Sequence, residues 1–271
     1  MDPCNHLAEK AAWVRRETLK LHAACPETRL AASLSCVEIL CTLFYGSVVR
    51  HNPKEPAWEG RDRFIISKGH GSISFYPVLA DLGYFPRYEL DRIGRRGGLL
   101  KVIPDTLIPG YESINGSVGQ GLGTACGMAL GLRSKDSDSR VFVLCGEGEF
   151  HEGALWEAIM FAGHHRLSNL ILVLDQNQRC MLGWSEDFVR LNPIDEKFRA
   201  FGWDVQSVDG HDVRALHAAL VGAKTTTTPR PRAVVANTIK GKGVPRLETD
   251  PLCHVRSLTP AEIAALLKEL P

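Results

Sequence analysis

The strongest constraint on the fold of this chain is the segment 141–177, in which two apolar runs flank a helix-like stretch and each run is followed by polar residues. The first run leads to Glu147, the second leads to Asn177, and the stretch between them, about 152–165, has the length of a helix. A strand–helix–strand unit of this kind joins parallel strands of one sheet. We therefore expect Glu147 and Asn177 to lie side by side at the carboxyl edge of a sheet, where ligands of open α/β sheets bind.

The residues at this expected edge suit a diphosphate held through a metal ion. A carboxylate and an amide oxygen are typical ligands of a hard divalent cation. The backbone N–H groups of Gly148 and Glu149 come at the start of the helical stretch, where a phosphate binds well. Because a carboxylate would repel a phosphate beside it, the pattern predicts a divalent cation, Mg²⁺ or alternatively Ca²⁺ or Mn²⁺, between them. Taken alone, Glu147 is also explained as an acidic residue favoured by the helix dipole.

The rest of the chain alternates strand-like and helix-like segments. Apolar runs predict strands at residues 63–67, 140–145, 169–175, 203–209 and 232–238. Helical patterns lie at residues 6–24, 70–83, 120–133, 152–165, 194–201, 212–224 and 259–270. This alternation indicates an α/β fold, a doubly wound and mainly parallel sheet with helices on both faces. Residues 95–121 are rich in glycine and proline and predict a long functional loop.

Two helical segments carry more detailed expectations. Ser35 and Glu38 form the S-x-x-E pattern of a capping box, ahead of an apolar run that would end at Gly46. Residues 120–133 are small and apolar throughout, which is typical of a buried and closely packed helix.

Composition narrows the class of protein. A chain of 271 residues with 44% hydrophobic residues can form one large domain, and we expect a single domain over residues 1–271, with 225–232 as a loop. The net charge of +1 gives no support for a nucleic-acid or membrane partner, and no apolar run reaches the roughly eighteen residues of a membrane span. The eight cysteines form no C-x-x-C pair and the N-terminus has no signal pattern, which favours a cytoplasmic protein with reduced thiols.

Five further segments, together with the interval of about thirty residues between Glu147 and Asn177, match one family pattern. The segments are 67–71 with 79–85 (S-K-G-H-G and L-A-D-L-G-Y-F), 108–112 (I-P-G-Y-E), 116–121 (G-S-V-G-Q-G), 198–203 with 208–212 (F-R-A-F-G-W and V-D-G-H-D) and 240–244 (K-G-K-G-V). In this order they resemble the transketolases, which use thiamine diphosphate (ThDP), over nearly the whole chain. The best match is the diphosphate-binding half that occurs as a separate subunit in split transketolases.

The resemblance implies a set of site residues. The residues expected to hold the cofactor are His70, Gly116, Ser117, Val118, Gly148, Glu149, Asn177, Met181 and His254, of which His70 and His254 are also the expected catalytic residues. The expected metal ligands are the side chains of Glu147 and Asn177 and the backbone carbonyl of Arg179. Glu152 is expected to meet the partner subunit.

The sequence departs from the family pattern at three positions. Glu147 replaces an aspartate, which places its carboxylate one methylene further from the chain. Arg29 and Ile103 stand where the family has histidines that hold the sugar. These two changes remove hydrogen-bonding capacity for hydroxyl groups, while an arginine can bind a carboxylate or phosphate bidentately. They favour a non-standard donor, an α-keto acid such as pyruvate rather than a ketose, in secondary metabolism.

The resemblance also implies a partner. The glutamate that protonates the aminopyrimidine ring of ThDP belongs to a pyrimidine-binding domain, which this sequence lacks. We expect an α₂β₂ assembly in which a separate subunit binds the pyrimidine, and which transfers a two-carbon ketol or acetyl unit to an aldehyde or ketone. Two alternatives remain. A 2-oxo acid decarboxylase or dehydrogenase component would share the cofactor motif but not segments 67–71 and 108–112. A catalytically silent structural subunit would share everything except metal binding.

Overall fold

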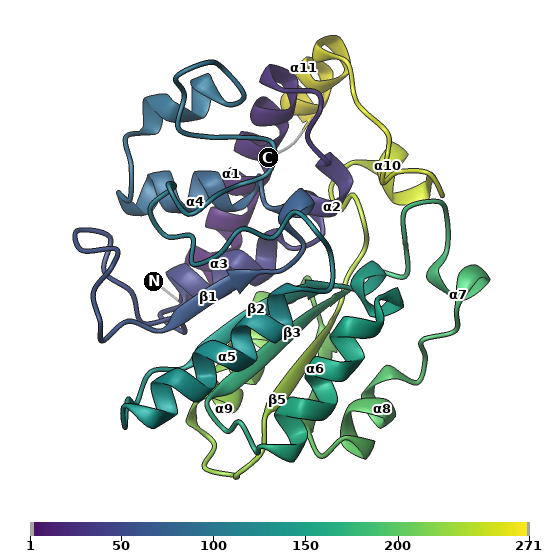
Figure 1. Ribbon diagram of the computed structural model, residues 1–271. Helices are drawn as coiled ribbons and strands as arrows, with labels where there is room; N and C mark the ends of the chain where they lie inside the picture. The colour runs from purple at the N-terminus through teal and green to yellow at the C-terminus, as the bar shows by residue number, and fades with distance from the viewer. Residues whose placement is uncertain (1–2, 270–271) are drawn as a thin grey trace.

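The chain folds around one five-stranded parallel sheet (Figure 1). The computed structural model describes residues 3–269. The strands are β1 (Arg63–Ile66), β2 (Val141–Gly146), β3 (Leu170–Gln176), β4 (Asp204–Asp209) and β5 (Arg232–Asn237). They lie in the order β1-β2-β3-β5-β4, and neighbouring strands run parallel. The predicted doubly wound α/β fold is confirmed, and each predicted strand agrees with the observed one to within about one residue at either end.

Helices precede, connect and follow the strands. The α-helices are α1 (Pro3–Ala24), α2 (Leu30–Leu34), α3 (Val37–Tyr45), α4 (Phe75–Leu82), α5 (Gly121–Ser134), α6 (Gly153–His164), α7 (Ser185–Phe188), α8 (Ile194–Ala200), α9 (Val213–Thr225), α10 (Pro245–Thr249) and α11 (Pro260–Glu269). Short 3₁₀ helices are η1 (Gly69–Gly71), η2 (Arg87–Arg92) and η3 (Glu147–His151). Within residues 3–269, no helix is long and apolar enough to cross a membrane.

The central strands are apolar throughout because helices cover both faces of the sheet. Phe142 and Leu144 of β2 point into a core shared with α1, α3, α4 and α9. Val143 and Cys145 point into a second core shared with α5, α6 and α8. Figure 1 shows α5 and α6 lying across one face of the sheet. Burial on both sides explains why the sequence reads as an uninterrupted apolar run instead of an alternating one.

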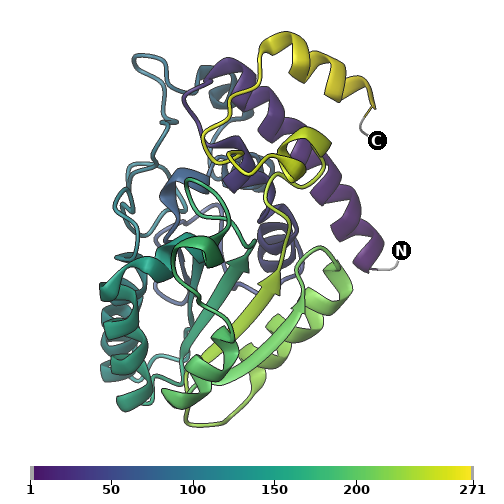
Figure 2. The same ribbon diagram turned by 90° about the vertical axis from the view of Figure 1, so that its right-hand side faces the viewer.

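A third apolar cluster brings the last part of the chain against the first. Side chains from α1, α2, α10 and α11 form it, and Figure 2 shows α11 near α1. His22 of α1 fastens the segment that precedes α11, because the Leu258 N–H donates to His22 Nε2 at 3.2 Å. The other ring nitrogen, Nδ1, lies 2.8 Å from Thr28 Oγ1. This segment carries His254, so the position of that residue depends on α1.

The predicted helix at 70–83 is wrong in its first part. Residues 69–71 form the 3₁₀ helix η1, and the α-helix begins only with α4. The reason is close packing: a Cβ atom on Gly71 would lie 2.7 Å from the Lys68 side chain and 2.9 Å from the Ala32 carbonyl oxygen. The chain here turns tightly against α2, a contact that the sequence pattern did not indicate.

The predicted capping box at Ser35 is also wrong. Cys36 stands at the N-cap of α3 and makes no side-chain capping bond. The Ser35 hydroxyl donates instead to the Asp175 carboxylate at 2.7 Å and approaches the Ala32 carbonyl at 3.2 Å. The short helix α2 ends at this point, so Ser35 belongs to its C-terminus. The predicted end of α3 at Gly46 is confirmed.

Helix α5 is buried on one side only, which corrects the expectation of a fully buried helix. Its buried residues are Gly121, Leu122, Ala125, Cys126, Ala129 and Leu132. On the opposite side Gly123, Gly127 and Gly131 are exposed, and a Cβ atom added at any of the three would meet no atom within 4 Å. Small residues fit both a crowded and an open face, so composition alone could not separate the two sides.

Candidate active site

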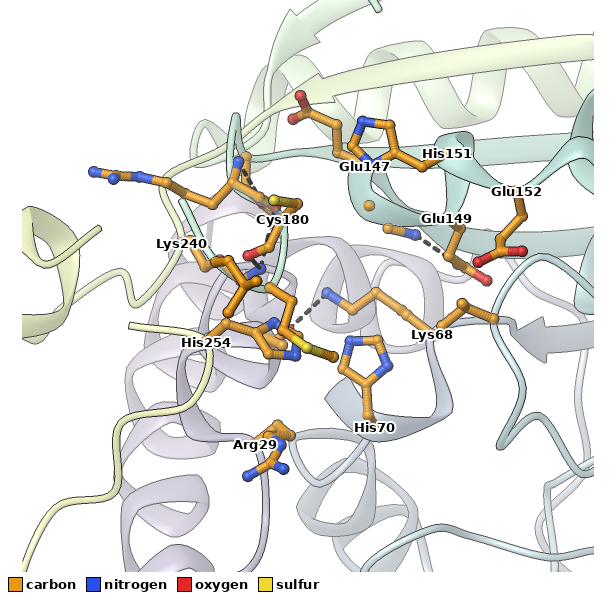
Figure 3. Close-up of a pocket in the computed structure, with 18 of the residues that line it drawn as sticks. Arg29, Lys68, His70, Glu147, Glu149, His151, Glu152, Cys180, Lys240 and His254 are labelled. Atoms are coloured by element: carbon orange, nitrogen blue, oxygen red, sulfur yellow. Dashed lines mark hydrogen bonds between the residues drawn. The ribbon is translucent and has the colours of Figure 1, made fainter. Parts of the chain in front are cut away.

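A cavity of about 700 Å³ lies at the carboxyl ends of β1, β2, β3 and β5. The predicted site residues that line it are Arg29, His70, Gly116, Ser117, Val118, Glu147, Gly148, Glu149, Glu152, Asn177, Arg179, Met181 and His254. Figure 3 shows side chains from these distant segments gathered around it. The sheet topology therefore brings together nearly the whole set of residues that the sequence predicted.

Ile103 is the exception among the predicted residues. It does not line the cavity. A Cβ atom built on Gly116 would lie 3.7 Å from Ile103 Cγ2, so Ile103 packs beside the loop that does line the cavity. Because the segment around it has no regular secondary structure, no periodic pattern could predict which way the Ile103 side chain points.

The turn after β2 is held by the side chain of Glu149, which is 2% exposed. Its Oε1 accepts hydrogen bonds from Ser67 Oγ at 2.6 Å and from Gly119 N at 2.9 Å. Its Oε2 accepts one from Gly146 N at 2.8 Å. Burial raises the pKa of Glu149, although these hydrogen bonds oppose the rise. Glu149 thus joins the ends of β1 and β2 to the loop 116–118, a role that the sequence did not indicate.

The three expected metal ligands are neighbours, but each already has another partner. The Gln178 N–H donates to the Glu147 carboxylate. Asn177 Oδ1 accepts the Arg179 N–H at 3.2 Å. The Arg179 carbonyl accepts the ammonium of Lys240 at 3.2 Å. Burial raises the pKa of Glu147, while the hydrogen bond from Gln178 opposes the rise.

These residues do not form a preformed site for a divalent cation. The Glu147 carboxylate and the Asn177 amide oxygen are suitable donors, but the Arg179 carbonyl is covered by an ammonium whose charge would repel a dication. Figure 3 shows the Glu147 carboxylate directed away from Lys68 and His70. Across the described residues 3–269, no three His, Cys, Asp or Glu side chains converge as metal ligands would. A metal here would therefore depend on one carboxylate, that of Glu147, together with amide and backbone oxygens, and on movement of Lys240.

A buried ion pair contributes to the lining of the cavity. Lys68 lines the cavity and pairs with Asp175, and both side chains are at most 2% exposed. Lys68 Nζ also donates to the Ala32 carbonyl at 2.6 Å, while Thr238 and Ser35 donate to the same Asp175 carboxylate. Burial alone would raise the pKa of Asp175, but the Lys68 charge and these hydrogen bonds outweigh it and lower the pKa. The pair ties α2 to β1, β3 and the segment after β5.

Lys240 is the clearest site residue that the sequence analysis missed. It lines the cavity, is 6% exposed, and its ammonium donates to the carbonyls of Arg179 and Cys180 at 3.2 and 3.4 Å. Burial lowers the pKa of Lys240 to about 8, and the charge of Lys68 adds to this effect. The available signal is the K-G-K-G motif at residues 240–243, which closely follows the last predicted strand and so places a lysine at the carboxyl edge of the sheet.

His70 and His254 both line the cavity and lie next to each other, with ring centroids 5.1 Å apart and ring planes tilted by 53°. Burial lowers the pKa of each to about 3, and the positive charges of Lys68, Lys240 and Arg29 contribute. Both rings are therefore neutral near pH 7, so each has one donor and one acceptor nitrogen. His254 Nδ1 is buried without a hydrogen-bond partner, as is expected of a polar atom that bonds a ligand.

The rim of the cavity is apolar on one side and cationic at one end. The exposed apolar residues that line it are Met181, Leu182, Phe188 and Val189. Arg29 is exposed and lies at the opposite end from Glu147 in Figure 3. Buried ammonium groups, an unpartnered histidine nitrogen and an apolar wall together fit a molecule with a diphosphate and a flat heterocycle, as ThDP has.

Comparison with known proteins agrees with this geometry. Residues 29–270 match the family described as the transketolase, thiamine diphosphate binding domain. The chain belongs to the transketolase family. The match spans most of the sequence, so nearly the whole of this transketolase-family chain corresponds to the ThDP-binding domain.

Relatives of similar length are named as transketolase subunits. One is the 6-deoxy-6-sulfo-D-fructose transketolase subunit SqwG of Clostridium sp., 37% identical over 97% of this chain and 96% of the relative. Another is an apulose-4-phosphate transketolase subunit of Actinobacillus succinogenes, 34% identical over 100% of this chain and 99% of the relative. A third relative, from Sinorhizobium fredii, is named as a transketolase family protein without the word subunit, and is 37% identical over 97% of this chain and 94% of the relative.

A solved transketolase has the same fold. The structure of Campylobacter jejuni transketolase superposes with a TM-score of 0.88 at 28% identity and covers 97% of this chain. The match takes up 42% of the Campylobacter jejuni chain. This transketolase-family chain thus has the length of its subunit relatives and less than half the length of the Campylobacter jejuni chain.

Proposed function

We propose that this chain is the diphosphate-binding subunit of a split, ThDP-dependent transketolase-like enzyme. The observation that carries the proposal is the cavity at the strand ends, where Lys68, Lys240, His70 and His254 converge beside the glycine turn at Gly148. Of these residues Lys240 is the buried cation without a carboxylate partner, because Lys68 is paired with Asp175 and both histidines are neutral, and an ammonium of this kind suits a diphosphate. The family match and the two relatives named as subunits support it.

Each part of the cavity has a role in this proposal. Bound ThDP would supply a thiazolium carbon that attacks a carbonyl and stabilises the resulting carbanion. The backbone N–H groups of Gly148 and Glu149 and the ammonium of Lys240 would hold the diphosphate. His70 and His254, both neutral and close together, would hold and move protons at the donor oxygen atoms. The apolar rim would exclude water once a partner covers it.

We propose that a divalent cation, Mg²⁺ in the first instance, binds the Glu147 carboxylate and the Asn177 amide oxygen. Binding requires the Lys240 ammonium to leave the Arg179 carbonyl, to which it donates a hydrogen bond at 3.2 Å. Once the Lys240 ammonium has left the Arg179 carbonyl, the bound diphosphate would accept its hydrogen bonds instead. The longer side chain of Glu147 sets this site apart from the family pattern, and its carboxylate would have to give up the Gln178 N–H or share it with the metal.

We propose that the pyrimidine-binding half is supplied by a separate subunit, in an α₂β₂ assembly. Two features support this idea. Two relatives that match this chain over nearly their whole length are named as transketolase subunits. Exposed apolar side chains at the cavity rim, among them Phe188 and Leu182, would be covered by a partner. Glu152 is exposed and lines the cavity, which suits its proposed contact with that partner.

We propose that the donor carries an anionic group that Arg29 binds. Arg29 lines the cavity near His70 and His254, where the family has a histidine. The relatives named above act, by their names, on a sulfonated and on a phosphorylated sugar. An α-keto acid such as pyruvate presents a carboxylate to the same guanidinium and is our preferred donor; it would lose this carboxylate as CO₂ and transfer the remaining two carbons as an acetyl unit.

The deciding experiment is to co-express the chain with its pyrimidine-binding partner and to measure turnover with ThDP and Mg²⁺. Donors to compare are pyruvate, xylulose 5-phosphate and 6-deoxy-6-sulfo-D-fructose, each with an aldehyde acceptor. Transfer of a two-carbon unit supports the proposal, and the preferred donor distinguishes acetyl from ketol transfer. Release of CO₂ without transfer would favour the decarboxylase alternative. A stable complex that binds ThDP but converts no donor would favour a silent subunit.

A further inference from the structure

The V-D-G-H-D motif at residues 208–212 has no role in the function proposed above. The structure places it directly against the segment that carries Lys240. The Gly210 N–H donates to the Asn237 carbonyl at 2.7 Å. A Cβ atom on Gly210 would lie 2.4 Å from Thr238 Cγ2, so only glycine allows this approach. The turn between β4 and α9 therefore supports the chain just before Lys240.

His211 makes the decisive contact of this turn. The Ile239 N–H donates to His211 Nε2 at 2.8 Å. Because Nε2 accepts a hydrogen bond, the ring proton is on Nδ1, which lies 3.0 Å from Glu38 Oε2. Glu38 in turn is paired with Arg15, and the side chains of His211, Glu38 and Arg15 are all about nine-tenths buried. A fixed chain thus runs from α1 through α3 to the main chain of Ile239.

Ile239 is bonded covalently to Lys240, whose side chain lines the cavity. The main chain beyond it is held by a second contact, from the Gly241 N–H to the Ala31 carbonyl at 3.0 Å. Two fixed points therefore flank Lys240. One of them, Ile239, depends on His211, so loss of the imidazole would release the Ile239 N–H and leave the bond from the Thr238 N–H to the Gln176 carbonyl, at 2.9 Å, as the nearest main-chain contact on that side.

We propose that His211 is a positioning residue, which holds Ile239 and thereby keeps the Lys240 ammonium directed at the diphosphate site. Glu38 and Arg15 keep the imidazole in the tautomer that this role requires. The inference rests on the proposed function only in that Lys240 faces a diphosphate. The positioning itself is a property of the chain alone.

The first test needs only this chain. Hydrogen exchange is measured for His211→Leu, which removes both ring nitrogens, and for His211→Gln, which keeps an acceptor and a donor. His217→Leu is the matched control, since His217 lies on the adjacent helix α9 and bonds the Gly46 carbonyl at 3.0 Å. We expect exchange at residues 238–243 to rise at least about tenfold in His211→Leu, to return toward wild type in His211→Gln, and to stay unchanged in the control. Unchanged exchange in His211→Leu, or an equal rise along β3, would overturn the positioning role.

The second test measures ThDP affinity in the complex with the partner, by calorimetry. We expect His211→Leu and Lys240→Met each to weaken ThDP binding by about tenfold. If His211 acts through Lys240, the double variant binds no more weakly than Lys240→Met alone. Additive losses, or wild-type affinity in His211→Leu, would overturn the inference. A wild-type complex that binds no ThDP would refute the proposed function instead, and hydrogen exchange would still decide whether His211 positions the segment.

Discussion

Replacing Glu149 by glutamine tests how much the three hydrogen bonds of this side chain stabilise the turn after β2. The amide oxygen can keep the bonds from Ser67 and Gly119 that Oε1 now accepts. The amide NH₂ must then face the Gly146 N–H, which donates to Oε2 at 2.8 Å. One hydrogen bond to a charged acceptor contributes about 1.5–3 kcal/mol. Because burial raises the pKa of Glu149, removing its charge offsets part of this loss, and we expect a net destabilisation of about 2 kcal/mol.

A loss of this size lowers the melting temperature of a chain this long by about 4–8 °C, which thermal unfolding followed by tryptophan fluorescence can resolve. Glu149→Ala removes all three bonds and should cost about 4 kcal/mol. Glu152→Gln is the matched control, because Glu152 is exposed in the same turn, and its effect should stay within about 0.5 kcal/mol. If Glu149→Gln had the melting temperature of the wild type, or one no lower than that of Glu152→Gln, the three hydrogen bonds of Glu149 would not be a significant source of stability.

Four further predictions concern the site and the fold. The isolated chain should bind ThDP weakly or not at all and the partner should restore binding, and calorimetry showing tight one-to-one binding by the chain alone would reject this. Asn177→Ala and Glu147→Ala should abolish metal-dependent activity of the complex while circular dichroism shows an intact fold, because both residues follow strand ends; full activity of Asn177→Ala at limiting Mg²⁺ would show that the metal assignment is wrong. Arg29→Met should raise the KM of the preferred anionic donor by about tenfold or more, and steady-state kinetics that favour xylulose 5-phosphate with no turnover of pyruvate would contradict the α-keto acid proposal. Burial lowers the pKa of His22 to about 4, so the unfolded chain takes up a proton below about pH 6.5 that the native chain refuses; stability should therefore fall as the pH drops from about 6.5 to 4, by up to about 3 kcal/mol from this residue, and His22→Gln should remove that part of the slope in urea titrations.

The sequence predicted the strands and their polar ends well, because those features are local. The apolar run before Glu147 and the one before Asn177 needed only a parallel connection to bring the two residues together, and the register pairs Gly146 of β2 with Asp175 of β3. The loop 116–118 and His254 could be placed at the same edge only through motif resemblance, since no periodic pattern reaches them.

What the sequence could not predict depends on contacts between distant segments. Ser35 matched a capping pattern, yet its hydroxyl bonds to Asp175, 140 residues away. Lys240 approaches the Arg179 carbonyl across 61 residues of sequence. The prediction for Glu149 concerns only its backbone N–H, because the bonds of its side chain to Ser67 and Gly119 exist only once three loops have met. Local propensity contains no information about such partners.

The glycines of α5 have an energetic consequence for the helix as a whole. Gly121 has a steric reason to be glycine, because a Cβ atom there would lie 2.5 Å from the Ser67 side chain. Gly123, Gly127 and Gly131 have open space around them and each weakens the helix by about 1 kcal/mol relative to alanine. In this chain α5 therefore depends on its buried face, and little on its own backbone preference, to remain helical. Alanine at these three exposed positions is therefore the simplest change that would stabilise the helix.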